Sequence, residues 1–234
     1  MSRIRPRDAA TLVLYRRAAS GRASDTRVLM GQRHSGHVFM PDKFVFPGGR
    51  VDIADCRLRP PRELREPVWA RVAQGTTRAR ARALALAAIR ETFEETGLRL
   101  GRPARATGAD GPPFHSRARS WREFLHDGLV PSLEVLDFVA RAVTPPGSPR
   151  RFDARFFMAE AVHAHGGEDA TLAGSGELID LQWLPLAHAR ALDLPEVTRL
   201  VLGEIERRLA SPNARSLPVP FVRWSRGGTV VESI

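Results

Sequence analysis

The segment spanning residues 76–96 constrains the fold of this chain more than any other feature of the sequence. It is rich in alanine, leucine and arginine, which are strong helix formers. Leu86, Ile89 and Phe93 recur at helical spacing and predict a single apolar stripe. Gly97 follows directly, where many helices end in a left-handed residue that favours glycine. The sequence therefore predicts a long helix over residues 76–96 that carries an apolar stripe.

Three glutamates lie near the end of this helix. Glu91, Glu94 and Glu95 stand at i, i+3 and i+4, so their side chains share one helical face. Their repulsion is unfavourable, and the negative end of the helix dipole increases it. A solvated acidic face would have the same spacing. Arg90 directly before the triplet, and the Pro-Gly-Gly turn at 47–49, instead favour a site for a cation such as Mg²⁺ or Mn²⁺, which prefer carboxylate oxygen.

The rest of the chain mixes strand-like and helical patterns, which indicates an α/β or α+β fold. Segments 50–75 and 99–120 are expected to be mostly irregular, and Ser120 is expected to cap a short helix at 120–127. The predicted strands are 10–16, 26–32, 43–46 (ending at the Pro-Gly-Gly turn), 136–143, 152–161 and 178–184, with a further strand in the tail. The other predicted helices are 67–73, 185–190 and 195–210.

Length and composition narrow the class of protein. The 234 residues fit one domain, 1–234, and no stretch approaches the ~18 apolar residues of a membrane span. The net charge of +10 comes almost entirely from arginines spread along the chain, which argues against a nucleic-acid surface and suits a small phosphate-rich ligand. The lone Cys56 and the lack of a signal-peptide pattern suggest a cytoplasmic protein, and a homodimer stays open.

The glutamate segment resembles the second half of the Nudix box, Gly-x5-Glu-x7-Arg-Glu-U-x-Glu-Glu-x-Gly-U, in which U is apolar. Thr92 replaces the first U, and Asp55 stands where the pattern has glutamate. Asp55 and Arg90 are separated by 34 residues where the pattern has seven, so the match needs a 27-residue insertion, placed at about 56–82. The matching positions are Gly49, Arg90, Glu91, Glu94, Glu95, Gly97 and Leu98.

With such an insertion, the sequence resembles one subgroup of the family, the Nudix hydrolases related to peroxisomal and mitochondrial coenzyme A diphosphatases. Segments 29–33, 39–41, 46–49, 150–153 and 155–157 are also similar to that subgroup. Trp183 lies where Nudix domains often carry tryptophan. A C-terminal helix plus tail, at about 195–234, follows the matching region.

The resemblance implies an α/β/α sandwich with a mixed sheet and a metal-dependent attack of water on a nucleoside diphosphate linked to another group. It implies Glu94 and Glu95 as the main metal ligands, Glu91 as ligand or base, and Gly49 as part of the metal site. Arg90 would pair with the first acidic residue of the box. Here that residue is Asp55, with Asp52 as second choice.

Other candidates are less specific. Glu177, before a late strand, is a candidate base or extra ligand, and Glu168 is a less favoured alternative. Arg33, Lys43 and Gly48 are candidate contacts for substrate phosphates. His163 and His165 lack a third ligand, and Cys56 lacks a catalytic partner, so we expect no metal or nucleophile there. The aromatic residues Trp121, Phe124, Phe156 and Phe157 are expected in the core.

Three functions follow from these observations. The first is hydrolysis of coenzyme A or acyl-coenzyme A, with an ADP-ribose or NADH pyrophosphatase as the alternative. The second is a nucleotide sensor without turnover, although retention of all three glutamates argues against it. The third is a nucleic-acid-binding module, which only the net charge suggests.

Overall fold

The computed structural model describes residues 4–34, 36, 42–104, 116–167, 170–174, 176–225 and 228–234. The motif at 39–41 and Glu168 lie outside them. Within these residues, nine strands form one sheet in the order β11-β10-β7-β8-β1-β2-β3, with β4 paired to β1 and β9 paired to β2. The strands are β1 (Arg7–Arg16), β2 (Arg27–Arg33), β3 (Phe44–Val45), β4 (Gly48–Arg50), β7 (Asp137–Val143), β8 (Phe152–Glu160), β9 (Leu178–Pro185), β10 (Pro220–Ser225) and β11 (Gly228–Ser233).

The sheet is mixed, as expected. Strand β1 runs parallel to β8, and β10 runs parallel to β7, while the other pairings are antiparallel. Strand β1 shows why the sheet is covered on both faces. Leu12 and Leu14 pack into one buried cluster, whereas Val13 and Tyr15 pack into another, because successive side chains of a strand point to opposite faces.

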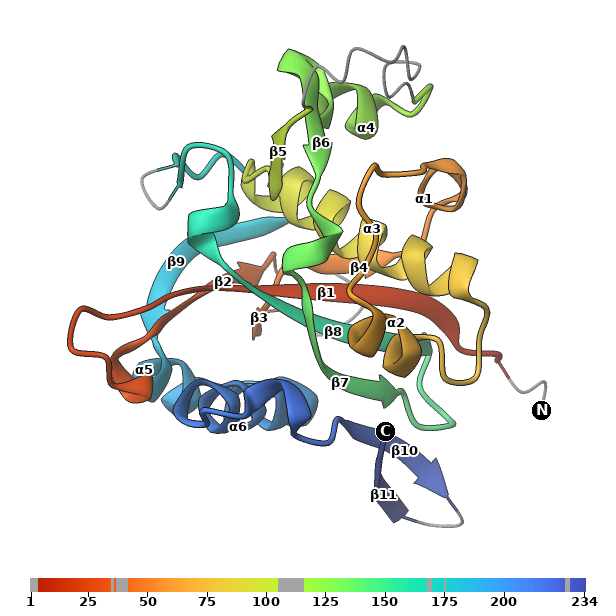
Figure 1. The fold of residues 1–234 in the computed structure, drawn as a ribbon. Helices are drawn as coiled ribbons and strands as arrows, with labels where there is room; N and C mark the ends of the chain where they lie inside the picture. Colours follow the sequence, from red (N-terminus) through yellow and green to blue (C-terminus); the bar gives the residue numbers. More distant parts are fainter. Residues whose placement is uncertain are drawn as a thin grey trace.

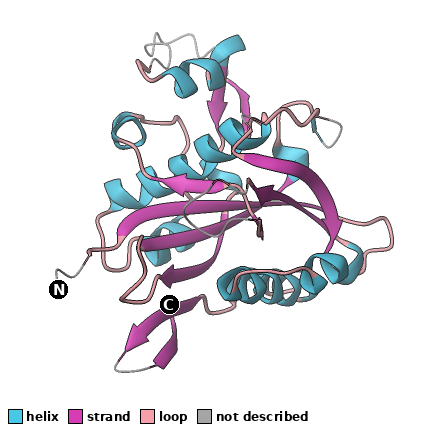
Figure 2. Cartoon of the chain, turned by 180° about the vertical axis from the view of Figure 1, so that it is seen from behind, coloured by secondary structure: helices cyan, strands magenta, loops and turns pink. Residues whose placement is uncertain are grey.

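Helices close both faces and make an α/β/α sandwich (Figure 1). Helix α3 (Arg78–Thr96) packs on one face, while α5 (Leu186–Ala191) and α6 (Glu196–Ala210) cover the other, as Figure 2 shows from behind. No helix of the described part is long and apolar enough to cross a membrane.

Helix α3 is more enclosed than predicted. The apolar stripe of Leu86, Ile89 and Phe93 packs in the core, and burial extends beyond it, since every residue from Ala83 to Arg90 is buried. The outer side is covered by α1 (Ile53–Arg57), α2 (Glu66–Val72) and α4 (Arg119–Phe124). Alanines allow these elements to approach closely. The expected C-terminal end is confirmed, because Gly97 ends the helix at φ 76°; the helix begins at Arg78 rather than Thr76, after Thr77 caps its first turn.

The segment expected to be an insertion is part of this packing. In the same buried cluster as Leu84, Leu86 and Ile89 of α3 are Leu58, Leu64, Val68 and Val72. Beyond the other end of α3, strands β5 (Gly101–Pro103) and β6 (Leu129–Pro131) form a separate two-stranded sheet beside α4 (Figure 1). We call β5, α4 and β6 the α4 lobe.

Four local predictions were wrong. Segment 50–75 contains the regular helix α1, and segment 99–120 contains β5. Residues 48–50 form a strand rather than a turn, because β1 supplies pairing partners. Helix α4 begins after Ala118 rather than Ser120, and no side chain caps it.

Candidate functional site

Two glycines bring strand β4 into contact with both β1 and α3. A Cβ at Gly48 would lie 2.6 Å from the backbone oxygen of Ala10, inside the sheet. A Cβ at Gly49 would instead lie 2.5 Å from Oε2 of Glu91. A side chain at position 48 would therefore collide with the backbone of β1, whereas Gly49 leaves room for the Glu91 carboxylate.

Glu95 is the most buried of the three glutamates, with 1% of its surface exposed. Its Oε2 accepts a hydrogen bond from the Gly48 N–H at 2.9 Å, while its Oε1 has no partner. Burial holds the pKa of Glu95 well above its usual range, and the charges of Glu91 and Glu177 raise it further against the lowering effects of Gly48 and Arg33. A buried oxygen without a donor marks a position suited to a cation.

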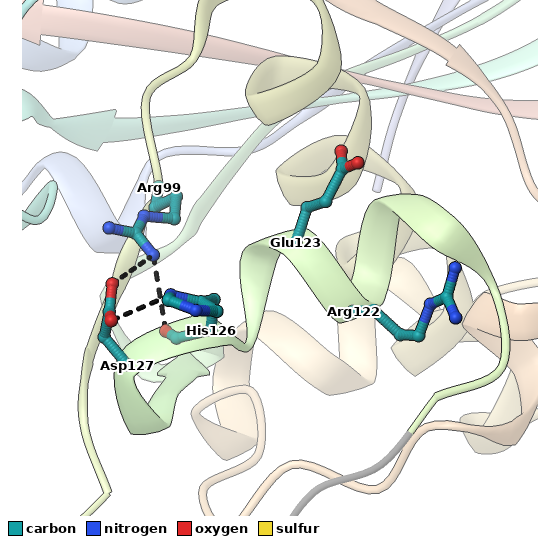
Figure 3. A pocket seen from close by; sticks show the side chains of 5 residues that line it. All are labelled: Arg99, Arg122, Glu123, His126 and Asp127. Carbon is teal, nitrogen blue, oxygen red and sulfur yellow. Dashed lines mark hydrogen bonds and ion pairs between the residues drawn. The ribbon is translucent and has the colours of Figure 1, made fainter.

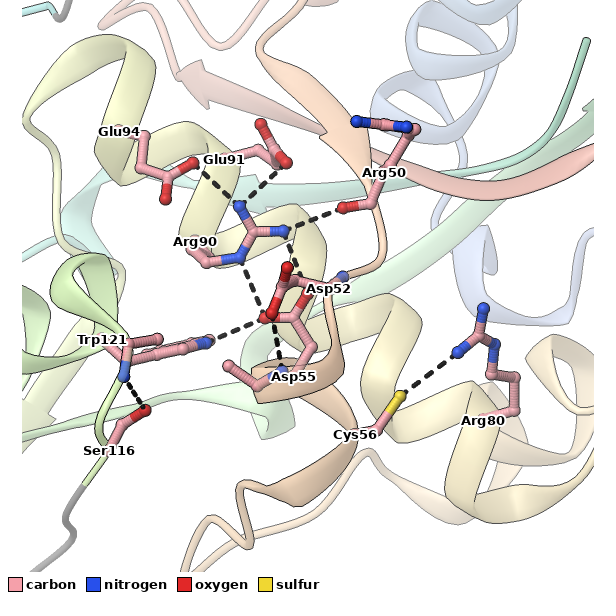
Figure 4. Close-up of polar contacts among 12 residues, drawn as sticks. Arg50, Asp52, Asp55, Cys56, Arg80, Arg90, Glu91, Glu94, Ser116 and Trp121 are labelled. Atoms are coloured by element: carbon pink, nitrogen blue, oxygen red, sulfur yellow. Dashed lines mark hydrogen bonds and ion pairs between the residues drawn. The ribbon is translucent and has the colours of Figure 1, made fainter.

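Arg90 orders the other two glutamates (Figure 4). Its Nη1 donates to Oε1 of Glu91 at 2.9 Å and to Oε2 of Glu94 at 2.8 Å. Although burial lowers the pKa of Arg90, hydrogen bonding to Asp55 and the charge of Glu91 outweigh it, so Arg90 stays charged. Part of the positive charge that the glutamates require therefore comes from this arginine.

The predicted pairing of Arg90 with Asp55 is confirmed. Nε and Nη2 of Arg90 each lie 3.0 Å from one oxygen of Asp55, which is fully buried. The shorter acid reaches the arginine because α1 carries it there. Asp52, the second choice, does not take this role: its carboxylate accepts from the Ala54 N–H and caps α1.

Burial also raises the pKa of Glu91 to about 7, with repulsion from Glu94 and Glu177 adding to it and Arg90 opposing it. Glu177 is exposed, yet its charge acts on both Glu91 and Glu95. Four carboxylates from α3 and the segment before β9 therefore share one region, in which like charges are poorly compensated.

The donor set fits a hard divalent cation, since it offers only oxygen, an unpartnered buried oxygen and excess negative charge. Among the described residues, no three His, Cys, Asp or Glu side chains already stand together as a metal-binding group. Oxygens of Glu91 and Glu94 are held by Arg90. Arg90 engages one oxygen of each carboxylate, which leaves the second oxygen of each for a cation.

The remaining candidates have different surroundings. The charge of Arg33 acts on Glu95, but Lys43 is paired with exposed Asp193. His163 and His165 are exposed, and no metal-binding group of the described residues includes them. Cys56 is a free thiol, and Nη1 of Arg80 lies 3.2 Å from its sulfur. The four aromatic residues expected in the core are buried: Trp121, Phe124, Phe156 and Phe157.

Trp121 also has a polar contact that sequence reasoning missed. Its indole N–H donates to Oδ1 of Asp55 at 2.8 Å (Figure 4). The two residues are 66 positions apart and lie in different elements. No local pattern could have indicated this contact.

Two pockets that do not include the glutamates are lined by charged side chains, several of which already have partners. In the first, Arg99 pairs with Asp127 at 3.5 Å and Nδ1 of His126 lies 2.8 Å from the same carboxylate (Figure 3). The second is lined by arginines that include Arg65, bonded to Asp137, and Arg208, bonded to backbone oxygens of the 214–218 segment. These contacts hold segments together and leave the glutamate helix as the candidate site.

Fold and site together define an α/β/α sandwich with an acidic, oxygen-only centre. No family model matches the chain. The acyl-coenzyme A diphosphatase NUDT19 of Gallus gallus is 31% identical over 65% of this chain and 54% of its own length. A crystal structure of a NUDIX hydrolase from Alicyclobacillus acidocaldarius is 28% identical, with a TM-score of 0.66 over 91% of this chain and 96% of that one.

The chain is therefore similar in sequence and in fold to Nudix hydrolases. A second curated relative, from Caenorhabditis elegans, is 29% identical and carries the same family name. The matches span 54% and 39% of the length of these two curated relatives, so the chain corresponds to about half of such proteins or less.

Proposed function

We propose that this protein hydrolyses the pyrophosphate linkage of a nucleoside diphosphate derivative with Mg²⁺ or Mn²⁺. The observation that carries this proposal is the environment of Glu95. A buried carboxylate with one backbone donor, an unpartnered oxygen and two like-charged neighbours is costly unless a cation joins it. A bound divalent cation would offset the free-energy cost of burying the Glu95 carboxylate.

The residue roles follow from position. Glu91, Glu94 and Glu95 would hold the cation, with Gly49 leaving room for the Glu91 carboxylate. Arg90 would orient Glu91 and Glu94 through its hydrogen bonds. Glu177 or Glu91 would take the proton of the attacking water. Arg33, Lys43 and the Gly48 backbone remain candidates for substrate phosphates, although Lys43 would first have to leave Asp193.

A bound divalent cation would neutralise the phosphate oxygens and lower the pKa of a coordinated water. The side chains contribute by fixing geometry before the reaction, which accounts for much of the rate in phosphate chemistry. Water oxygen forms a bond to one phosphorus while the bridging oxygen leaves with the other. The products are two phosphomonoesters.

Coenzyme A or its acyl derivative is the first candidate substrate. Support comes from the subgroup-like insertion and upstream segments, and from the acyl-coenzyme A diphosphatase among the relatives. Its products would be 4′-phosphopantetheine, or the acyl form, and 3′,5′-adenosine diphosphate. ADP-ribose and NADH are the competing substrates.

A product-resolved screen tests both levels of the proposal. Purified protein is incubated with coenzyme A, an acyl-coenzyme A, ADP-ribose or NADH, with Mg²⁺ or Mn²⁺, and the products are separated by chromatography. Cleavage of coenzyme A into the two phosphomonoesters is expected. Cleavage of ADP-ribose alone would remove the coenzyme A assignment. Tight binding without any product would indicate a sensor and remove the hydrolase proposal.

A further inference from the structure

The hydrogen bonds of Arg90 are all committed. A guanidinium has five N–H donors. In this chain they go to both oxygens of Asp55, to the Arg50 backbone oxygen, and to one oxygen each of Glu91 and Glu94 (Figure 4). Any movement of Arg90 therefore moves the glutamates, and the position of Arg90 depends on Asp55.

Asp55 is equally committed. Its Oδ1 accepts from Arg90 and from the indole of Trp121, and its Oδ2 accepts from Arg90 and from the Asp52 N–H. The residue has 0% exposure, so water has no ready access to replace a lost donor. Removing one donor from a buried carboxylate costs free energy. Arg90 would then shift to compensate Asp55.

Trp121 is linked to helix α3 through Phe124, its neighbour in helix α4. Its ring packs edge-on against Phe124, with centroids 5.2 Å apart. Phe124 in turn packs edge-on against Phe93 at 5.6 Å. Phe93 lies between Glu91 and Glu94 in the helix. The α4 lobe therefore reaches the glutamate helix twice, by aromatic packing at Phe93 and by the indole hydrogen bond through Asp55.

We propose that Trp121 is a positioning residue, which acts through Asp55 and Arg90 to hold Glu91 and Glu94 ready for a divalent cation. The inference rests on the proposed function. The indole N–H of Trp121 is an uncharged donor. It supplies a hydrogen bond to Asp55 without placing a second positively charged side chain near the glutamates. The indole thereby leaves Nη1 of Arg90 to those two side chains.

Trp121→Phe removes the donor and keeps most of the packing. We expect the dissociation constant for Mn²⁺, titrated on the full chain by paramagnetic resonance, to rise by about threefold to tenfold, because loss of outer hydrogen bonds weakens metal sites. Activity should fall at low metal concentration and largely recover at saturating metal. Trp69→Phe is the matched control, since its indole donates at 3.0 Å to the Arg78 backbone oxygen, away from the glutamates.

Two comparisons separate positioning from stability. Phe124→Leu disturbs the same aromatic contacts without removing the indole donor. It should lower the melting temperature and leave the affinity for Mn²⁺ close to that of the wild type. In an Asp55→Asn background, Trp121→Phe should have almost no further effect on affinity, since the two residues act in series. An equal loss in both backgrounds would overturn the inference.

The outcomes also separate this inference from the proposed function. If the wild type binds Mn²⁺ and Trp121→Phe binds it with the same affinity, the inference is contradicted and the proposed function is not affected. Failure of Trp121→Phe to fold, while Phe124→Leu folds, would assign the hydrogen bond to stability and have the same consequence. A wild type that binds no Mn²⁺ would remove the proposed function, and the inference with it.

Discussion

Glu95 is the residue at which stability and function conflict most directly. Glu95→Gln removes the buried charge but keeps an oxygen able to accept from the Gly48 N–H. We expect kcat to fall by at least about 10²-fold, on the scale of lost metal-site interactions. The melting temperature of the metal-free protein should rise, because an uncompensated buried carboxylate disappears. Steady-state kinetics and melting in the presence of a chelator measure both effects.

An exposed glutamate on the opposite side of the sheet provides the control for this change. Glu196 lies in the first turn of α6, and Glu196→Gln should leave kcat and the melting temperature nearly unchanged. Near-normal turnover in Glu95→Gln would contradict the ligand role, even if the protein became more stable.

The raised pKa of Glu91 predicts a specific dependence of stability on pH. The folded state holds this proton more tightly than the unfolded state. The resulting stabilisation is complete below pH 4.5 and is lost as pH rises toward 7. The displacement from 4.5 to about 7 corresponds to ~3 kcal/mol for this buried group. Denaturant unfolding without divalent metal, at pH 5 and pH 8, measures the change.

Glu91→Gln isolates this contribution, since the neutral amide does not titrate. The drop in unfolding free energy between the two pH values should be smaller in the variant. Added Mn²⁺ should stabilise the wild type more at pH 8 than at pH 5, because ligand carboxylates must be deprotonated. The groups that act on Glu91 are Arg90, Glu94 and Glu177. An identical pH response in the two proteins would exclude the raised pKa.

At the scale of elements, the contact of β4 with α3 predicts opposite effects for two adjacent glycines. In Gly49→Ala, the new methyl meets the flexible end of Glu91, which can turn away. Activity and metal affinity should fall by about tenfold or more, on the scale of displaced outer contacts, with little loss of stability. In Gly48→Ala, the methyl meets the Ala10 backbone, so the melting temperature should fall. Equal melting temperatures in the two variants would contradict this distinction.

The elements differ in how far they could be predicted from sequence. Helix α3 was predictable because its composition, length and terminal glycine all agree. Helix α1 has only five residues and no periodicity, although Asp52 and Asp55 form a capping box that could have indicated it. Strand β4 contains two glycines, which are depleted in strands, and it forms because β1 lies beside it.

At the scale of the molecule, the glutamates were predictable because one helix carries them. The partners that define their chemistry were harder to predict, since Gly48 lies 47 residues from Glu95 and Trp121 lies 66 residues from Asp55. The Arg90–Asp55 pair was predicted only through the family resemblance. Contacts of this separation are created by the packing of α1 and the α4 lobe on α3, which local patterns do not encode.

The segment at 56–82 tests whether the inserted length belongs to the core of the molecule. Leu64 has 4% exposure and packs in the buried cluster that includes the α3 side chains. Leu64→Ala should cost about 2–5 kcal/mol of unfolding free energy, as buried leucines do, because a cavity would form in that cluster. Gln74→Ala, at an exposed position in the same segment, should change it by less than about 0.5 kcal/mol. Urea unfolding measures both variants. A small effect of Leu64→Ala would mean that the segment can separate from α3, whereas a large cooperative loss would mean that the protein unfolds with this segment as part of its core.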